Sequence, residues 1–131
     1  MARMVLKFGG TSVADLERIE HVAGVVAERA RQGDGLAVIV SAMSGETNKL
    51  VGLAQGAAGE GVSGADYDDE YDVVVSSGEQ VTSGLLALAL RKRGLKARSW
   101  LGWQLAMKTT DDHGKARIEG FEGESLPERI D

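Results

Sequence analysis

The sequence predicts an α/β fold built on a mainly parallel sheet. Residues 3–8 and residues 36–40 are apolar segments with the length and composition of buried strands. Between them, residues 14–32 place apolar side chains at three- and four-residue steps, with charged side chains in the intervening positions, which is typical of an amphipathic helix. A strand, a helix and a second strand in this order form one βαβ unit, whose two strands run parallel.

Two polar turns follow the two predicted strands. One covers residues 7–12, and the other, at 41–48, leads into a helix that reaches about residue 58. Residues 59–66 are rich in glycine, serine and alanine, which indicates a loop. In open parallel sheets ligands bind beyond the carboxyl ends of the strands, so we expect the two turns to lie at a ligand site.

The next part of the chain is predicted to be helical. Residues 67–76 favour a helix that breaks at Ser77–Gly78. A longer helix at 79–93 is apolar nearly all round, so we expect it to be buried. A strand is predicted at 95–101.

The C-terminal part of the chain gives weaker signals. Short strand pieces are predicted within 103–118, around a turn at Asp111–Gly114, and a helix is predicted to begin near Leu126. We find no repeat, low-complexity tract or internal domain boundary. The three or four predicted strands are fewer than a doubly wound sheet usually has, so we expect the 131 residues to be part of a larger protein.

Composition excludes several classes of function. The net charge of −5 argues against non-specific binding of nucleic acids, which needs a basic surface. The absence of cysteine excludes disulfides and thiolate metal sites. We find no signal peptide and no apolar stretch long enough to span a membrane, so a cytoplasmic protein is expected.

A candidate phosphate site lies at the end of the first predicted strand. A lysine inside a buried strand is costly unless an anionic group meets it, and Lys7 has this position. Gly9 and Gly10 follow, and they let backbone N–H groups approach a ligand closely. A helix start with unpaired amides and a nearby lysine is suited to phosphate, so we expect a phosphoryl group here.

Residues of the other turns extend this site. Ser41 and Thr47 would donate hydroxyl groups, and Glu79 would supply a carboxylate that can receive an ammonium group. A phosphate-binding loop beside an ammonium acceptor suggests phosphoryl transfer to an amino acid.

Each of these residues also has a purely structural interpretation. Lys7 could extend into solvent from a strand end, and Gly9–Gly10 could be a plain tight turn, because neither the Rossmann nor the P-loop spacing is present. Ser44 and Thr47 could cap a helix. Ser76 with Glu79 and Ser77 with Gln80 both have the spacing of a capping box, although capping and ligand contact are compatible.

No metal ligands are predicted. Asp111, Asp112 and His113 could suggest a metal site, but three adjacent residues rarely converge on one ion. We therefore interpret these residues as a surface turn.

Four segments together resemble the signatures of the aspartate kinases, in the order that this family has them. They are Lys7–Val13, Val40–Asn48, Ser77–Gln80 and Asp112–Ile118. The family transfers the γ-phosphoryl group of ATP to the side-chain carboxylate of L-aspartate, giving 4-phospho-L-aspartate. This reaction opens the biosynthesis of lysine, threonine and methionine.

The resemblance also implies roles for individual residues. Lys7 would bind the ATP phosphates and stabilise charge in the transition state. The phosphate loop would be formed by Phe8, Gly9 and Gly10, and aspartate would be held by Ser41, Thr47 and Glu79. Mg²⁺ would be bound mainly through the phosphates, and the enzyme would be a homo-oligomer.

The resemblance implies a three-layer αβα sandwich with a mainly parallel sheet. Residues 1–131 would form the N-terminal, substrate-side part of this domain. The nucleotide half and the paired regulatory ACT domains of the family lie outside the chain, so we expect the 131 residues to be inactive alone.

Two alternative functions remain. Other enzymes with this fold, such as carbamate, acetylglutamate or uridylate kinase, share a Lys-Gly-Gly-like start but lack the Ser-Gly-Glu turn with the spacing of Ser41 and Thr47. Alternatively, the chain is a non-catalytic fragment that binds a partner or self-associates through an open sheet edge.

Overall fold

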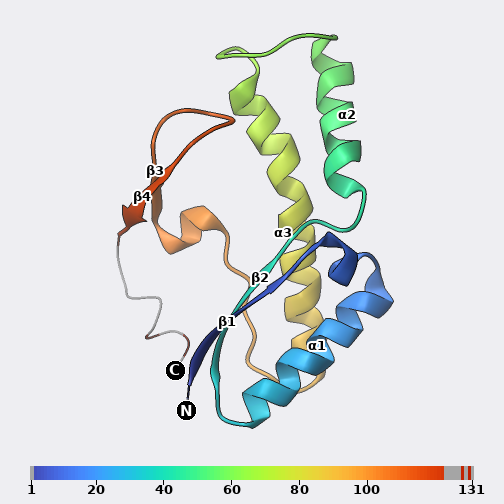
Figure 1. The fold of residues 1–131 in the computed structure, drawn as a ribbon, viewed down its shortest axis with the longest axis vertical. Helices are drawn as coiled ribbons and strands as arrows, with labels where there is room; N and C mark the ends of the chain where they lie inside the picture. Colours follow the sequence, from blue (N-terminus) through green and yellow to red (C-terminus); the bar gives the residue numbers. More distant parts are fainter. Residues whose placement is uncertain (1, 123–127, 129, 131) are drawn as a thin grey trace.

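Two parallel strands lie at the centre of the fold (Figure 1). β1 (Arg3–Phe8) pairs with β2 (Gly35–Val40) over their whole length, with Arg3 opposite Gly35 and Phe8 opposite Val40. The computed structural model describes residues 2–122, 128 and 130. The parallel pair confirms the predicted βαβ unit and gives a mixed α/β fold with a small parallel sheet.

α1 (Leu16–Arg31) connects the two strands and is the amphipathic helix that the apolar spacing predicts. The N–H of Arg18 donates to Oδ1 of Asp15 at 2.8 Å, which caps the first turn. Gly33, with φ of +89°, follows the last turn. The buried residues of α1 are three and four positions apart: Ile19, Val22, Ala23, Val26 and Ala27.

Replacing Asp15 with alanine is expected to lower the stability of the protein by about 1 kcal/mol, because the cap of α1 is lost. Thermal unfolding of the variant measures this loss. Asp15→Asn is the matched control, because asparagine keeps the acceptor oxygen and removes only the charge. An equal loss in both variants would contradict the capping explanation and assign the effect to the helix dipole.

α3 (Asp68–Lys92) is one continuous helix of 25 residues, so the predicted break at Ser77–Gly78 is wrong. Serine and glycine are weak helix formers, and the local sequence therefore favours a break. In the structure, the Ser77 hydroxyl donates to the Val74 carbonyl of its own helix at 2.6 Å. Gly78 is buried against Ala42 of the loop that follows β2. Tertiary packing thus overrides the local preference.

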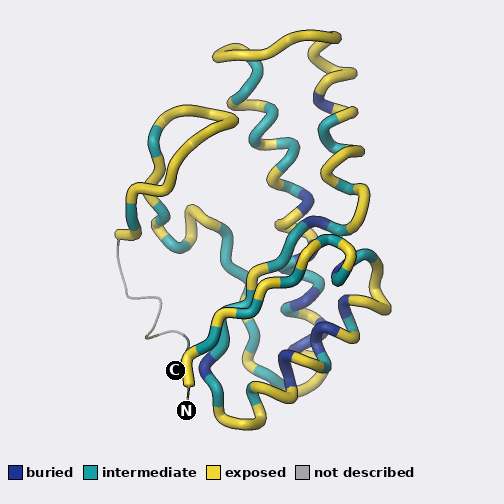
Figure 2. Tube along the Cα trace, in the orientation of Figure 1, coloured by how far each residue is buried: buried dark blue, intermediate teal, exposed yellow. Residues whose placement is uncertain are grey.

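The hydrophobic core lies between α1, α3 and one face of the sheet. Figure 2 shows the buried positions gathered on α1 and on the C-terminal half of α3. At the surface, Glu20 of α1 pairs with Lys92 at 3.0 Å and with Arg93 at 3.1 Å. The hydrogen bond from Lys92 holds the pKa of Glu20 below its usual value. The buried core cluster is Val13, Ile19, Val22, Ala23, Val26, Leu86, Ala89 and Leu90.

The other face of the sheet is open to solvent. Exposure alternates along β1, and the side chains of Val5 and Ile39 are 68% and 51% exposed. The prediction that residues 3–8 and 36–40 form buried strands is therefore wrong for this face of the sheet. α3 is also less buried than predicted, because Val81 and Leu88 are exposed. Within the described residues the fold has helices over one face of this sheet, and the full three-layer sandwich is not evident.

α2 (Glu46–Ala58) is the helix predicted after the polar turn, and it packs along the N-terminal half of α3 (Figure 1). A short 3₁₀ helix, η2 (Gly102–Leu105), precedes a hairpin that lies apart from the central sheet. In the hairpin, β3 (Met107–Thr109) pairs antiparallel with β4 (Ile118–Phe121). β3 confirms a short strand within the predicted range 103–118, whereas β4 lies almost entirely beyond that range.

Residues 95–101 form no strand, contrary to the prediction. Leu95 and Ala97 pack against the core, which explains their apolar character. The Ala97 carbonyl accepts from Nε of Arg91 at 2.7 Å, so the segment is tied to α3. The helix predicted near Leu126 begins outside the described residues.

By length and composition, α3 is long and apolar enough to cross a membrane. The prediction that the chain contains no such stretch is therefore wrong. One such helix is weak evidence for a membrane span, because core helices of globular proteins pass the same test. In this structure α3 packs against both α1 and α2.

Candidate functional site

The carboxyl ends of β1 and β2 continue into two loops that lie in contact. The N–H of Ser41 donates to the Phe8 carbonyl at 3.1 Å, one residue beyond the end of β2. A Cβ added to Gly10 would lie 3.1 Å from the Ala42 carbonyl oxygen, so the close approach of the loops favours glycine at this position. The segments after the two strands therefore form one continuous surface.

The middle of α3 contacts the loop after β2. Oε1 of Glu79 accepts the N–H of Ala42 at 3.2 Å, and the Thr82 hydroxyl donates to the Ser41 carbonyl at 2.8 Å. A Cβ on Gly78 would lie only 2.8 Å from Cβ of Ala42. The structure therefore brings Ser41 and Glu79 together at the carboxyl end of the parallel sheet.

Lys7 lies on the open face of β1, opposite Ile39 of β2, and is exposed. The premise that this lysine is buried in a strand is therefore wrong for the described structure, since the side chain pays no burial cost. An exposed lysine at a strand end is still accessible to an anionic ligand. Its neighbour Phe8 points to the opposite face and packs against the core.

The double glycine leads into a short 3₁₀ helix, η1 (Gly10–Val13), and not directly into a long helix. The N–H of Ser12 donates back to the Gly9 carbonyl at 3.0 Å. α1 begins after Asp15, which caps it. A short 3₁₀ turn thus separates the two glycines from the start of the long helix that was predicted directly after them.

The capping interpretations are wrong for three of the polar residues. The residue that precedes α2 is Gly45, with φ of +81° and no side-chain cap, so neither Ser44 nor Thr47 caps this helix. Glu79 lies in the interior of α3, where a capping box cannot form. Thr47 is exposed in the first turn of α2, which begins at the same loop.

Two residues that contact this loop were not predicted as site residues. Gly78 and Thr82 lie four positions apart, on the same side of α3, and both are buried. A small residue and a hydroxyl group at this spacing within an apolar helix is the sequence signal that could have identified them. Pattern alone does not reveal that their partner is the loop after β2.

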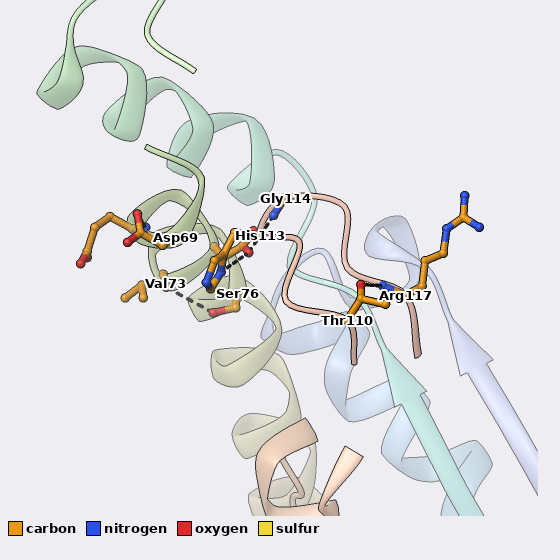
Figure 3. Close-up of polar contacts among 9 residues, drawn as sticks. Asp69, Val73, Ser76, Thr110, His113, Gly114 and Arg117 are labelled. Atoms are coloured by element: carbon orange, nitrogen blue, oxygen red, sulfur yellow. Dashed lines mark hydrogen bonds and ion pairs between the residues drawn. The ribbon is translucent and has the colours of Figure 1, made fainter. Parts of the chain in front are cut away.

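The turn at 110–117 contacts α3 away from this surface (Figure 3). The N–H of Gly114 donates to Oδ2 of Asp72 at 2.9 Å, and Nδ1 of His113 lies 3.4 Å from the same oxygen. The N–H of Arg117 donates to the Thr110 hydroxyl at 3.1 Å, across the base of the turn. His113 thus pairs with a helix carboxylate. Among residues 2–122, 128 and 130, no three His, Cys, Asp or Glu side chains form a metal-binding group.

Several curated proteins with similar sequences are named aspartate kinase or aspartokinase. The chain is 52% identical over 118 residues to the aspartate kinase of Pseudomonas fluorescens (strain SBW25), covering 90% of this chain and 28% of that protein. It is 45% identical over 118 residues to the aspartokinase of Geobacillus stearothermophilus, again covering 90% of this chain and 28% of that protein. The chain therefore spans less than a third of the length of these curated relatives.

Structural comparison gives the same result. The crystal structure of the aspartate kinase from Synechocystis matches with a TM-score of 0.65 and 40% identity, over 75% of this chain and 16% of that chain. The family described as the amino acid kinase family matches residues 2–124, a range that includes the central sheet, its helices and the hairpin. The chain belongs to the amino acid kinase family.

Proposed function

We propose that this chain forms the aspartate-binding side of an aspartate kinase, which transfers the γ-phosphoryl group of ATP to the side-chain carboxylate of L-aspartate. In this reaction a carboxylate oxygen of aspartate forms a bond to γ-phosphorus, and the bond from that phosphorus to the bridging oxygen of ADP breaks. The observation that carries the proposal is the position of Glu79, whose carboxylate meets the loop at the carboxyl end of the sheet. The similarity to proteins named aspartate kinase supports it.

Phosphoryl transfer depends mainly on positioning and on electrostatic stabilisation of the spreading negative charge. Lys7 is exposed and supplies a full positive charge at the end of β1. The turn at Gly9 and Gly10 supplies backbone N–H groups beside it. In the proposed site, Lys7 binds the ATP phosphates and stabilises the transition state, and Phe8, Gly9 and Gly10 form the loop around the phosphates.

The aspartate side of the proposed site contains Ser41, Thr47 and Glu79. A carboxylate has two oxygens, and Ala42 occupies one of those of Glu79, so the other is suited to the α-ammonium group of the substrate. The Ser41 and Thr47 hydroxyls supply hydrogen bonds to the substrate carboxylates. Ammonium and carboxylate recognition together favour an amino acid as the phosphoryl acceptor.

Further parts of the proposal follow from the family. The chain would contribute the substrate side of a three-layer αβα kinase domain, with Mg²⁺ held mainly by the ATP phosphates. The enzyme would be a cytoplasmic homo-oligomer. Assaying the complete product of the reading frame with ATP against aspartate, carbamate, N-acetylglutamate and UMP tests the proposal. Preferential phosphorylation of any acceptor other than aspartate would refute it.

Glu79→Gln is expected to raise the KM for aspartate by about 10- to 100-fold, which is the effect of losing a charge-assisted hydrogen bond. The KM for ATP should change little. Steady-state kinetics with each substrate varied in turn give both values. Glu70→Gln is the matched control, because Glu70 is an exposed glutamate in the first turn of the same helix. A lower melting temperature with an unchanged KM for aspartate would show that Glu79 stabilises the fold through its hydrogen bond with Ala42 and does not bind the substrate.

A further inference from the structure

The peptide group between Ser41 and Ala42 is held at both ends by side chains of α3. Its carbonyl accepts the hydroxyl of Thr82 at 2.8 Å, and its N–H donates to Glu79 at 3.2 Å. The carbonyl and the N–H of a trans peptide point in opposite directions, so two separate groups are needed to fix its orientation. Glu79 and Thr82, three positions apart on one side of α3, supply these two groups.

Thr82 is completely buried, with 0% of its surface exposed. Its hydroxyl has one hydrogen to donate and three carbonyl acceptors nearby: those of Ser41 at 2.8 Å, Glu79 at 3.2 Å and Gly78 at 3.4 Å. A threonine inside a helix often bonds only to its own preceding turn. Here the shortest contact leaves the helix and joins the loop that carries Ser41.

Gly78 permits this arrangement. A Cβ on Gly78 would lie 2.8 Å from Cβ of Ala42 and 3.3 Å from Cδ1 of Leu50, so a larger residue would push the loop away from α3. The absence of a side chain keeps the loop within reach of both Glu79 and Thr82. The three residues therefore act together on one peptide group.

We propose that Thr82 is a positioning residue for the phosphoryl acceptor. By fixing the Ser41–Ala42 peptide it sets the direction in which the Ser41 side chain leaves the backbone, and it prepares this loop before the substrate binds. Thr82 is completely buried, so a ligand cannot reach its side chain, and it acts only through Ser41 and the loop. This inference rests on the proposed function, since it assigns Ser41 to aspartate.

The test compares Thr82→Val with Thr82→Ser in the complete product of the reading frame. Valine keeps the shape of threonine and removes the hydroxyl, whereas serine keeps the hydroxyl and removes a methyl group. Thr82→Val is expected to raise the KM for aspartate about tenfold, with the KM for ATP unchanged, and Thr82→Ser is expected to stay within about twofold of the wild type. Ser83→Ala is the matched control, because the Ser83 hydroxyl donates only within α3, to the Gln80 carbonyl at 3.0 Å.

Two kinetic outcomes would overturn the proposal. If Thr82→Val and Thr82→Ser lower the melting temperature but leave the KM for aspartate unchanged, Thr82 is a packing residue. If Thr82→Val raises the KM for ATP as much as the KM for aspartate, the loop affects the binding of both substrates, and Thr82 does not specifically position the phosphoryl acceptor.

Hydrogen exchange separates failure of this inference from failure of the proposed function. If the wild-type protein does not phosphorylate aspartate, the proposed function fails, and with it the assignment of the acceptor. The positioning of the peptide is then judged by exchange of the Ala42 amide. Exchange about tenfold faster in Thr82→Val than in Thr82→Ser, with the amide of Val22 in α1 unchanged, supports the positioning role. Equal exchange of the Ala42 amide in the two variants overturns it.

Discussion

Replacing Lys7 with alanine in the complete protein should reduce kcat by about 10²- to 10³-fold, the usual cost of removing one electrostatic contact with a developing charge. Lys7 is exposed at the end of β1, beside the double-glycine turn. A charge that stabilises the transferring phosphoryl group acts mainly in the transition state, so kcat should fall more than the affinity for either substrate. Rapid-quench or coupled assays with ATP and aspartate measure this loss.

The stability of the Lys7→Ala variant should be close to that of the wild type. Exposed side chains away from special contacts contribute within about 0.5 kcal/mol, so the melting temperature should shift by only a few degrees. Lys96→Ala is the matched control, because Lys96 is an exposed lysine in the segment after α3. A melting temperature that falls in proportion to the activity would contradict a catalytic role for Lys7.

Replacing Gly78 with alanine should destabilise the protein, although alanine is the better helix former. The new Cβ would lie 2.8 Å from Cβ of Ala42, whose loop is tied to α3 and cannot retreat without breaking the contacts of Glu79 and Thr82. Overpacking of this kind costs about 1–3 kcal/mol. We also expect a higher KM for aspartate, because the displaced loop carries Ser41.

Gly84→Ala gives the opposite expected result and serves as the matched control. Gly84 lies in the same helix, and a Cβ added there would have nothing within 4 Å. The substitution should therefore stabilise the protein by about 0.5–1 kcal/mol through helix propensity alone. Differential thermal unfolding of the two variants measures the contrast. If both variants gain stability, the contact between α3 and the loop after β2 is looser than the structure indicates.

The central βαβ unit could be predicted from sequence because its signals are periodic and local. Apolar residues recur in α1 at steps of three or four positions, with polar residues between them. The apolar segments of β1 and β2 are each followed by glycine or polar residues. These patterns depend only on how side chains project from a helix or a strand. The parallel pairing of β1 with β2 follows, because a helical connection returns the chain to the same end of the sheet.

α3 and the segment at 95–101 could not be predicted in the same way. Ser77 and Gly78 have poor helix propensity, and only the contact of Gly78 with Ala42 explains why a glycine lies inside a continuous helix. Leu95 and Ala97 are apolar because they pack on the core, and their pattern looks like that of a strand. The local sequence shows that a residue is apolar or small, but it does not show which distant part of the chain that residue contacts.

The βαβ unit, the family resemblance and the candidate residues at the strand ends could all be inferred from the order of residues. The chemistry of these side chains and their short-range spacing are encoded locally, and folding does not change which residue follows which. The three-dimensional fold was needed to show that Glu79 reaches Ala42, that Thr82 bonds to the Ser41 carbonyl, and that Lys7 is exposed on an open sheet face. These contacts join residues about 40 positions apart in the chain, and their geometry is set by the packing of α3 against the end of the sheet.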